Sequence, residues 1–488
     1  MNSAITDTEA QGQDITAQSG RFWVVTYLAI TGLVLLLMMV FGLLMRLAQA
    51  GWLAIDPSLF YEIMTVHGVG MVGIASLGGV AVMWHFLARY VSLRAGVLAI
   101  NLVLFLVGVV AMLAADFIGG FAAAWTFLYP LPAVSGSVWP AWSAELHLFG
   151  LLLVGVGFLL ICLEVGRALI AEYGGLGRAL GWHKLFFNSD DNVPPPAAVA
   201  AAMVVIVDTP ALIAGAAVIV MSLVNLFAPT IAINPLLAKN LIYFFGHVII
   251  NATIYMAVIA VYELLPRITG RKWKTTRVFL AAWTLSTTMV LVIYPHHLLM
   301  DFVMPTWAMM LGQVLSYINS FPVLVVTGLG ALAILHRSGI RWDLVSTLLF
   351  ISIFGWMAGV VPAVIDATVV VNSVMHNTLW VPGHFHFYLL LGLLPMIFAV
   401  MIHLARNEDV TPRGGDLTAI LYLLFGLIFV IMFLAGGWAS VPRRWAVHLE
   451  QWQIWDKVAS VMAAGVIVIA TIFVVMFLAR IPGMLRQK

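Results

Sequence analysis

The sequence contains few charged residues for its length. Only 9% of its 488 residues are charged, 63% are hydrophobic and the mean hydropathy is +1.06. In water-soluble domains about a quarter of the residues are charged, so this composition excludes that class and predicts a polytopic membrane protein. The net charge of +2 is too small to indicate nucleic acid or an acidic substrate as a partner.

Cysteine is almost absent as well. Cys162 is the single thiol, so this chain cannot build a disulfide framework, a cysteine-rich zinc site or an iron–sulfur cluster. Any metal must therefore be held by other side chains. The 13 histidines are the obvious supply, because neutral imidazole is the commonest metal ligand.

Long apolar runs predict an all-α integral membrane protein with twelve transmembrane helices. A span needs roughly 20 apolar residues. Residues 1–21 are expected to form a cytoplasmic N-terminal segment, and residues 22–488 a single twelve-helix domain. The expected spans lie near 22–48, 59–88, 95–115, 142–170, 196–227, 235–265, 278–300, 305–336, 342–366, 373–404, 416–440 and 455–480.

The basic residues predict how the chain is oriented. Twelve spans place both termini on one side, and most of the 23 Lys and Arg residues fall on that side. The positive-inside rule therefore predicts a multi-pass protein of the inner (cytoplasmic) membrane with both termini in the cytoplasm. The exceptions on the outer side are Arg46, Lys239, Arg443, Arg444 and Lys457.

Several histidines fall inside or at the edge of these spans. Polar side chains at such depth are costly unless they face a cavity, a partner or a metal. An interhelical hydrogen bond explains one such histidine equally well, but a group of seven favours cofactor binding. The group comprises His67, His247, His296, His297, His376, His384 and His386.

Spacing adds geometry to this group. On a helix, His384 and His386 are about 200° apart around the axis and point to opposite sides, so one helix can serve two cofactors. Adjacent His296 and His297 diverge by about 100°, which lets both reach one metal if His247 lies opposite. The alternative for the tandem pair is a solvated loop. Imidazole-only sites suit copper, iron and zinc, and haem iron takes an axial histidine.

Six motifs, in order along the chain, resemble the catalytic subunit (subunit I) of the haem–copper oxidase superfamily, most closely its B-type branch. They are TVHGVGM at 65–71, WTFLYPLP at 125–132, FFGHV at 244–248, YPHHLLMD at 294–301, MHNTLWVPGHFHF at 375–387 and VPRR at 441–444. The resemblance implies a twelve-helix catalytic domain that takes part in respiratory electron transport.

The resemblance also assigns cofactor ligands. It makes His67 and His386 the axial ligands of a low-spin haem b, and His384 the proximal ligand of a high-spin haem, expected to be haem b. A non-haem metal would be held by His247, His296 and His297. Arg443 and Arg444 would bind the haem propionates, where arginine suits bidentate contact with carboxylates; lipid headgroups are the alternative. His376 and Asn372 are expected in the same cofactor-binding region.

Asn251 departs from the family pattern. Oxygen-reducing A- and B-type enzymes have a cross-linked tyrosine four residues after the first metal histidine. C-type enzymes have one six residues before the tandem pair, where this chain has Val290. Familiar nitric oxide reductases have a glutamate at the position of Asn251. A neutral amide shares a helix face with His247 and is a weaker metal ligand than a carboxylate, so three imidazoles favour copper over iron. An interhelical hydrogen bond without a catalytic role is the alternative for Asn251.

Two more departures concern protons. Positions that carry hydroxyls on the B-type uptake path align with Val323, Val326 and Leu329, although Thr327 is adjacent and Tyr262 is retained. An acidic position four residues before the HNT histidine aligns with Asn372. Both changes remove groups that a proton pump would use, so weak or absent pumping is expected.

Three functions follow from these residues. The first is a respiratory nitric oxide reductase in which Asn251, the three metal histidines and His384 form the catalytic site. The second is a terminal oxygen reductase in which another residue, such as Tyr294, replaces the missing tyrosine. The third is a twelve-helix transporter without redox chemistry. The first two need a second subunit carrying dinuclear copper or a cytochrome, with cytochrome c or a similar donor, because Cys162 alone cannot form that copper site.

Overall fold

Among the residues that it describes, the computed structural model has 12 helices long and apolar enough to cross a membrane, which confirms the predicted all-α membrane fold. The structure describes residues 2–300, 304–319, 321–406 and 415–486, with side chains from residue 20 onward except 415–416. The spans are Gly20–Gln49, Pro57–Leu87, Gly96–Phe117, Ala141–Tyr173, Pro196–Phe227, Pro235–Thr269, Arg277–Leu298, Thr306–Leu335, Leu344–Asp366, Trp380–Ala405, Leu417–Trp438 and Glu450–Arg486.

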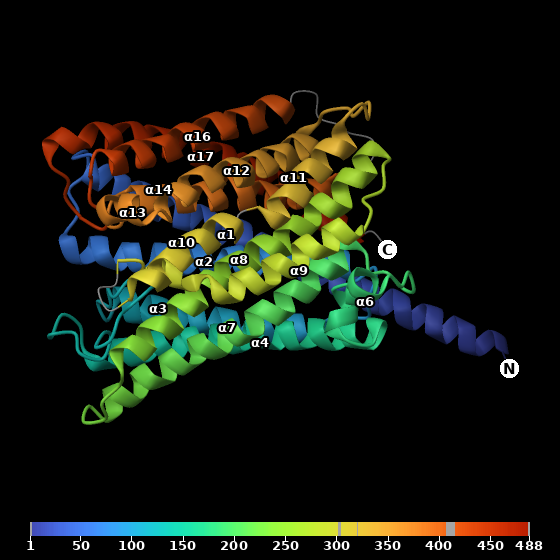
Figure 1. Ribbon diagram of the computed structural model, residues 1–488, viewed down its shortest axis with the longest axis horizontal. Helices are drawn as coiled ribbons and strands as arrows, with labels where there is room; N and C mark the ends of the chain where they lie inside the picture. The colour runs from blue at the N-terminus through green and yellow to red at the C-terminus, as the bar shows by residue number, and fades with distance from the viewer. Residues whose placement is uncertain (1, 301–303, 320, 407–414, 487–488) are drawn as a thin grey trace.

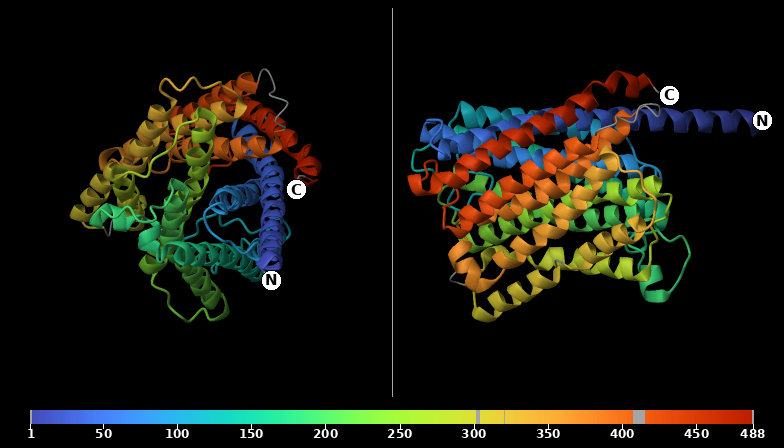
Figure 2. Two further views of the ribbon diagram at one scale, coloured as in Figure 1. Left: turned by 90° about the vertical axis from the view of Figure 1, so that its right-hand side faces the viewer. Right: turned by 90° about the horizontal axis from the view of Figure 1, so that it is seen from above.

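The helices run side by side in one bundle, and both termini lie at the same end of it (Figures 1 and 2). Residues 2–19 continue the first helix beyond the bundle. The helices are α1 Asn2–Gln49, α2 Pro57–Leu87, α3 Gly96–Phe117, α4 Ala141–Tyr173, α5 Leu176–Ala179, α6 Trp182–Phe187, α7 Pro196–Phe227, α8 Pro235–Thr269, α9 Arg277–Val292, η1 Tyr294–Leu298, α10 Thr306–Asn319, α11 Pro322–Leu335, α12 Leu344–Asp366, α13 Val369–Met375, α14 Trp380–His386, η2 Phe387–Leu393, α15 Leu394–Ala405, α16 Gly415–Trp438, η3 Glu450–Trp452, α17 Gln453–Leu478 and α18 Ile481–Arg486.

Local sequence sets the limits of α8, which carries His247 through the centre of the bundle. The Asn234 side chain accepts hydrogen bonds from the main-chain N–H groups of Leu236 and Leu237, and Pro235 occupies the first turn. Both features are typical of a helix start. Gly270, in the left-handed conformation, ends the helix. Between these ends, 89% of the most apolar window is buried, so α8 is a central helix.

One predicted span begins at a different residue, and another has the predicted limits but contains two helices. The tenth begins at Trp380 and not near residue 373, because α13 ends at Met375 and a turn separates it from α14. The eighth consists of α10 and α11, with Pro322 at the first turn of the second piece. Proline cannot donate a main-chain hydrogen bond and breaks a continuous helix.

The tenth span also widens directly after His386. Residues Phe387–Leu393 form a π-helix, and Pro395 follows it without a main-chain N–H to donate. The Ser352 hydroxyl donates to the carbonyl of Gly392 at 2.7 Å and so satisfies one carbonyl of this segment. π-helical turns are frequently found at functional sites.

Candidate metal and cofactor site

Three histidines converge from two elements of the bundle. His247 lies on α8, and His296 and His297 lie on η1; their potential ligand nitrogens are all within 4.8 Å of one another. His247 Nδ1 is 3.1 Å from His297 Nε2. Two nitrogens bound to one metal at about 2.0–2.1 Å are themselves about 3 Å apart. The cluster therefore has the spacing of a three-imidazole metal site, and the tandem pair is not in a solvated loop.

A tight turn brings the tandem pair to this position. α9 ends at Val292, and Pro295 in the first turn of the 3₁₀-helix prevents α9 from continuing. The Ser316 hydroxyl donates to the Gly312 carbonyl at 2.7 Å and contacts His296 Nδ1 at 3.1 Å, so it accepts from that nitrogen. This contact fixes the His296 tautomer and leaves Nε2 as its ligand atom. Asp301, the last residue of the YPHHLLMD motif, lies outside the described residues.

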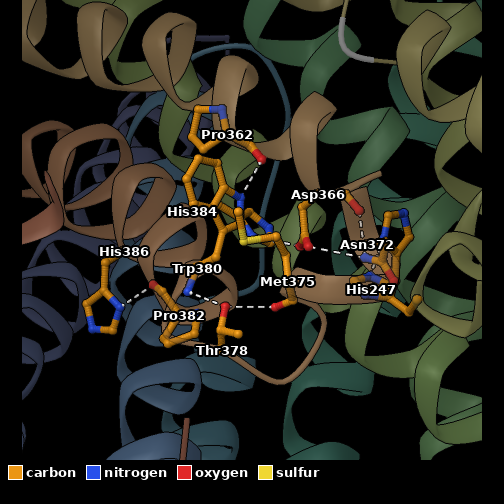
Figure 3. Close-up of polar contacts among 11 residues, drawn as sticks. His247, Pro362, Asp366, Asn372, Met375, Thr378, Trp380, Pro382, His384 and His386 are labelled. Carbon is orange, nitrogen blue, oxygen red and sulfur yellow. Dashed lines mark hydrogen bonds and ion pairs between the residues drawn. The ribbon is translucent and has the colours of Figure 1, made fainter. Parts of the chain in front are cut away.

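His67 and His386 share one cavity, and each is held in the same manner. His67 Nδ1 donates to the Met38 carbonyl and His386 Nδ1 to the Pro382 carbonyl, both at 2.7 Å (Figure 3 draws the second). Each Nε2 is then the free ligand atom, as a second-shell hydrogen bond commonly arranges. Gly42 is needed beside His67, since a Cβ there would lie 2.9 Å from the ring.

His384 leaves α14 in a different direction from His386 (Figure 3). Its Nδ1 lies 3.3 Å from Asp366 Oδ2 at the end of α12. The His386 ring is stacked against Phe433, with centroids 5.2 Å apart. The two imidazoles thus have separate surroundings, as the spacing of two residues on a helix predicts. Both line the same cavity as the three-histidine cluster, which has a volume of about 520 Å³.

Asn251 lines this cavity one turn after His247 on α8. Its amide nitrogen donates to the main-chain carbonyl of His247 at 2.8 Å. The contact lies within α8, so the side chain is not used for an interhelical hydrogen bond through that nitrogen. The amide oxygen is a potential acceptor or weak metal ligand.

Arg443 and Arg444 line the cavity. A short antiparallel bridge between Thr378 and Pro442 fixes their loop, with main-chain bonds from Leu379 to Val441 and from Arg443 to Asn377, each 2.9 Å. The VPRR segment is therefore attached to the HNT segment next to α14. His376 and Asn372 also line the cavity, on the same side.

Arg443 and His376 have perturbed pKa values. Burial, followed by the neighbouring charge of Arg444, lowers the pKa of Arg443 to about 10. Burial and then the Arg443 charge lower the pKa of His376. Arg443 stays cationic at neutral pH, and neighbouring groups offset its positive charge only in part. A buried cation of this kind suits the binding of a carboxylate anion.

Two groups of site residues were not singled out by the sequence. Arg46 lines the cavity and pairs with Asp456 at 2.9 Å, and His448 Nδ1 contacts the other Asp456 oxygen at 2.6 Å. The Arg46 guanidinium lies 4.6 Å from the centre of the Phe433 ring. The sequence marked Arg46 only as one of five exceptions to the predicted charge asymmetry, not as a site residue. Asp366, which faces His384, gave no comparable signal.

Tyr262 of α8 and Thr327 of α11 are in contact. Their hydroxyls are 2.6 Å apart, and Trp283 Nε1 donates to Tyr262 at 3.2 Å. Val323 lines the cavity, and Val326 and Leu329 complete the apolar replacements. The retained Tyr262 therefore still has a hydroxyl partner, Thr327, one position after the aligned residue Val326.

The residues present suit two haems and one further metal. Within the part of the chain that the structure describes, the buried His247 Nε2 atom has no hydrogen-bond partner. Unpaired buried imidazole nitrogens are costly without a ligand or other partner. The cavity of about 520 Å³ falls in the usual size range for cofactor pockets, roughly 300–1,000 Å³. Imidazole is a suitable ligand for haem iron and copper.

Comparisons with known proteins agree with this arrangement. The family model described as cytochrome c and quinol oxidase polypeptide I matches residues 23–468. The chain is similar to cytochrome c oxidase subunit 1 of Thermus thermophilus, 26% identical over 43% of this chain and 41% of that protein. It is also similar to cytochrome c oxidase subunit 1 of a Synechocystis species, 24% identical over 72% of this chain and 62% of that protein. Each alignment thus spans less than two thirds of the relative.

A solved structure described as a heme–copper terminal oxidase dimer has a similar fold. The TM-score is 0.78 at 21% sequence identity, and the match covers 96% of this chain and 84% of that one. At this identity the likeness concerns the fold. It supports the predicted twelve-helix arrangement.

Proposed function

This chain belongs to the cytochrome c and quinol oxidase polypeptide I family, that of haem–copper oxidase subunit I, and on that premise we propose that it is the catalytic subunit of a respiratory nitric oxide reductase. The family makes it a membrane oxidoreductase of electron transport. The proposed reaction takes two NO, two electrons and two protons to N₂O and water. The observation that carries the proposal is Asn251, which stands on the cavity next to the three histidines where oxygen reductases have a tyrosine.

The proposal assigns each histidine a role. His67 and His386 hold the low-spin haem b, His384 holds the high-spin haem, and His247 with the tandem pair holds copper in preference to iron. When bound, these groups supply the electrons and the Lewis acidity that NO reduction needs. Arg443 and Arg444 bind propionates, and His376 and Asn372 lie beside them. Ser316 and the main-chain carbonyls of Met38 and Pro382 orient ligands through their second ring nitrogens.

Asn251 is proposed to act on the substrate oxygen. Its amide nitrogen is engaged by the His247 carbonyl, so the side chain is held on the cavity face and its oxygen is available to the metal or to a proton-bearing group. A tyrosine there would supply an electron and a proton for splitting dioxygen. NO coupling has no O=O bond to break and needs neither from this position.

A terminal oxygen reductase remains the second candidate, because both relatives described above are cytochrome c oxidase subunits. Tyr294 is poorly placed to replace the missing tyrosine, since it donates to Asn240 Oδ1 at 3.0 Å. Among the described residues, the tyrosines that line the cavity are Tyr243, Tyr255 and Tyr388. Tyr243 is stacked on His297, with centroids 6.0 Å apart, and is the better candidate for this alternative.

The proposal includes partners and a location. Electrons enter through a second subunit with dinuclear copper or a cytochrome, fed by cytochrome c or a similar donor, because Cys162 is buried and alone. The chain lies in the inner membrane with both termini in the cytoplasm. Proton pumping is weak or absent, since Asn372 and the apolar residues of α11 replace groups that a pump uses.

Peptide mass spectrometry with metal analysis tests this proposal. We expect one copper per chain beside two haems, and no covalent link between His247 and any tyrosine. A His–Tyr cross-link involving Tyr243 or Tyr255 would instead favour the oxygen reductase. A purified complex without haem absorption bands would contradict both redox functions and favour a transporter.

A further inference from the structure

Asp366 is a carboxylate in an unfavourable place. It is the last residue of α12, and its side chain is only 13% exposed. The carbonyl groups at the C-terminal end of a helix carry a partial negative charge, which disfavours an acidic side chain there. Removal from water adds a further cost. A local partner must therefore offset both effects.

Asn372 supplies one such contact and fixes the carboxylate. Its Nδ2 donates to the Asp366 main-chain carbonyl at 2.6 Å and to Oδ1 at 3.2 Å (Figure 3). The other carboxylate oxygen, Oδ2, lies 3.3 Å from His384 Nδ1. That nitrogen is buried and has no hydrogen bond to another described residue. Asn372 thus places a carboxylate beside an imidazole nitrogen that needs an acceptor.

The three proposed haem ligands differ in this respect. His67 and His386 donate Nδ1–H to main-chain carbonyls, which are neutral acceptors. His384 alone of the three faces a carboxylate. An anionic acceptor raises the basicity of a ligating imidazole more than a carbonyl does, because charge-assisted hydrogen bonds are about twice as strong. Electron density then increases at the metal, and its oxidised form is stabilised.

We propose that Asp366, oriented by Asn372, is a positioning residue that accepts the Nδ1–H of His384 and lowers the reduction potential of the high-spin haem relative to the low-spin haem. The inference rests on the proposed role of His384 as the proximal ligand. It gives Asn372 a function of its own: the amide holds an acid that lies six residues earlier in the chain. No substrate contact is assigned to either residue.

The test uses the complete complex with both haems and the variant Asp366→Asn. Resonance Raman spectra of the reduced enzyme should show the iron–histidine stretching band of the high-spin haem at lower frequency than in wild type. Its reduction equilibrium against a mediator should shift at least tenfold towards the reduced form, which is about 59 mV for one electron. The low-spin haem should keep its potential and spectrum.

Two further variants separate this role from a general loss of charge or structure. Asn372→Leu keeps the carboxylate but removes its two contacts, so the same band should move in the same direction by a smaller amount. Glu62→Gln removes a half-buried acid elsewhere and should leave both haems unchanged. If Asp366→Asn does not retain the high-spin haem, Asn372→Leu and Asp366→Glu carry the test.

The outcomes distinguish the inference from the proposed function. A high-spin haem whose band and potential are unchanged in both Asp366→Asn and Asn372→Leu would overturn the inference and leave the NO reductase proposal intact. Equal shifts in Glu62→Gln would also overturn it. If wild type and His384→Ala had identical high-spin spectra, the ligand assignment itself would be wrong, and the proposed function would lose its basis.

Discussion

Removing Asp456 should damage the low-spin haem site from a distance. Asp456 and its two partners, Arg46 and His448, are almost completely buried. The carboxylate is 2.9 Å from the Arg46 guanidinium and 2.6 Å from His448 Nδ1. In Asp456→Ala the Arg46 charge stays buried without its partner, and breaking a buried ion pair in this way costs about 3–5 kcal/mol.

The loss should also reach His386. Arg46 lies over Phe433, and Phe433 is stacked against the His386 ring. Without Asp456, Arg46 loses the partner that holds it over Phe433, and the stack loses one support. We therefore expect a changed or weakened low-spin haem spectrum together with the loss of stability, while the high-spin haem, on the His384 side of α14, is less affected.

A replacement of both charges separates the two effects. Arg46→Met with Asp456→Leu removes the ion pair without leaving a charge, so only the unpaired His448 nitrogen remains, at about 1–3 kcal/mol. The free energy of unfolding, measured by detergent titration in mixed micelles, should be highest for wild type, lower for the double variant and lowest for Asp456→Ala. The control is Lys184→Ala, which removes an ion pair whose acid is 81% exposed. It should not change the free energy of unfolding measurably. Equal stability of Asp456→Ala and wild type would refute the reasoning.

Three shorter predictions concern the cavity. His297→Ala should lose the non-haem metal, because only two imidazoles remain, while both haems are retained; metal analysis checks this. Asn251→Tyr and Asn251→Glu should each change the rate of NO reduction, and the wild-type rate in both variants would mean that the position is unimportant. Arg443→Leu should release haem about tenfold or more readily, since hydrogen bonds to charged groups contribute about 1.5–3 kcal/mol. In wild type, haem retention should be constant at neutral pH and fall as the pH passes about 10, where Arg443 loses its charge.

Hydropathy was sufficient to predict the number of spans, and motif spacing was sufficient to predict that His247, His296 and His297 lie together. Apolar runs of bilayer length are a strong signal, and all twelve spans are found. The pair His384 and His386 diverges because helix geometry fixes the angle between residues two positions apart. The start of the tenth span was misjudged, since residues 369–375 are apolar and helical but form a separate helix, and the span begins at Trp380.

Contacts between distant residues could not be predicted in the same way. Arg46 and Asp456 are 410 positions apart, and only the packing of α1 against α17 joins them. Asp366 meets His384 because α12 ends beside α14, which no local pattern encodes. Tyr294 shows the converse: proximity in sequence to the tandem histidines made it a candidate, yet its hydroxyl contacts Asn240.

The most direct test of the proposed function is turnover of both gases by one preparation. The purified, fully metallated complex should be supplied with the same electron donor and either NO or oxygen. The account predicts that NO is consumed rapidly with one N₂O formed for every two NO, and that oxygen is reduced slowly. Rapid four-electron reduction of oxygen to water, with little N₂O from NO, would contradict it.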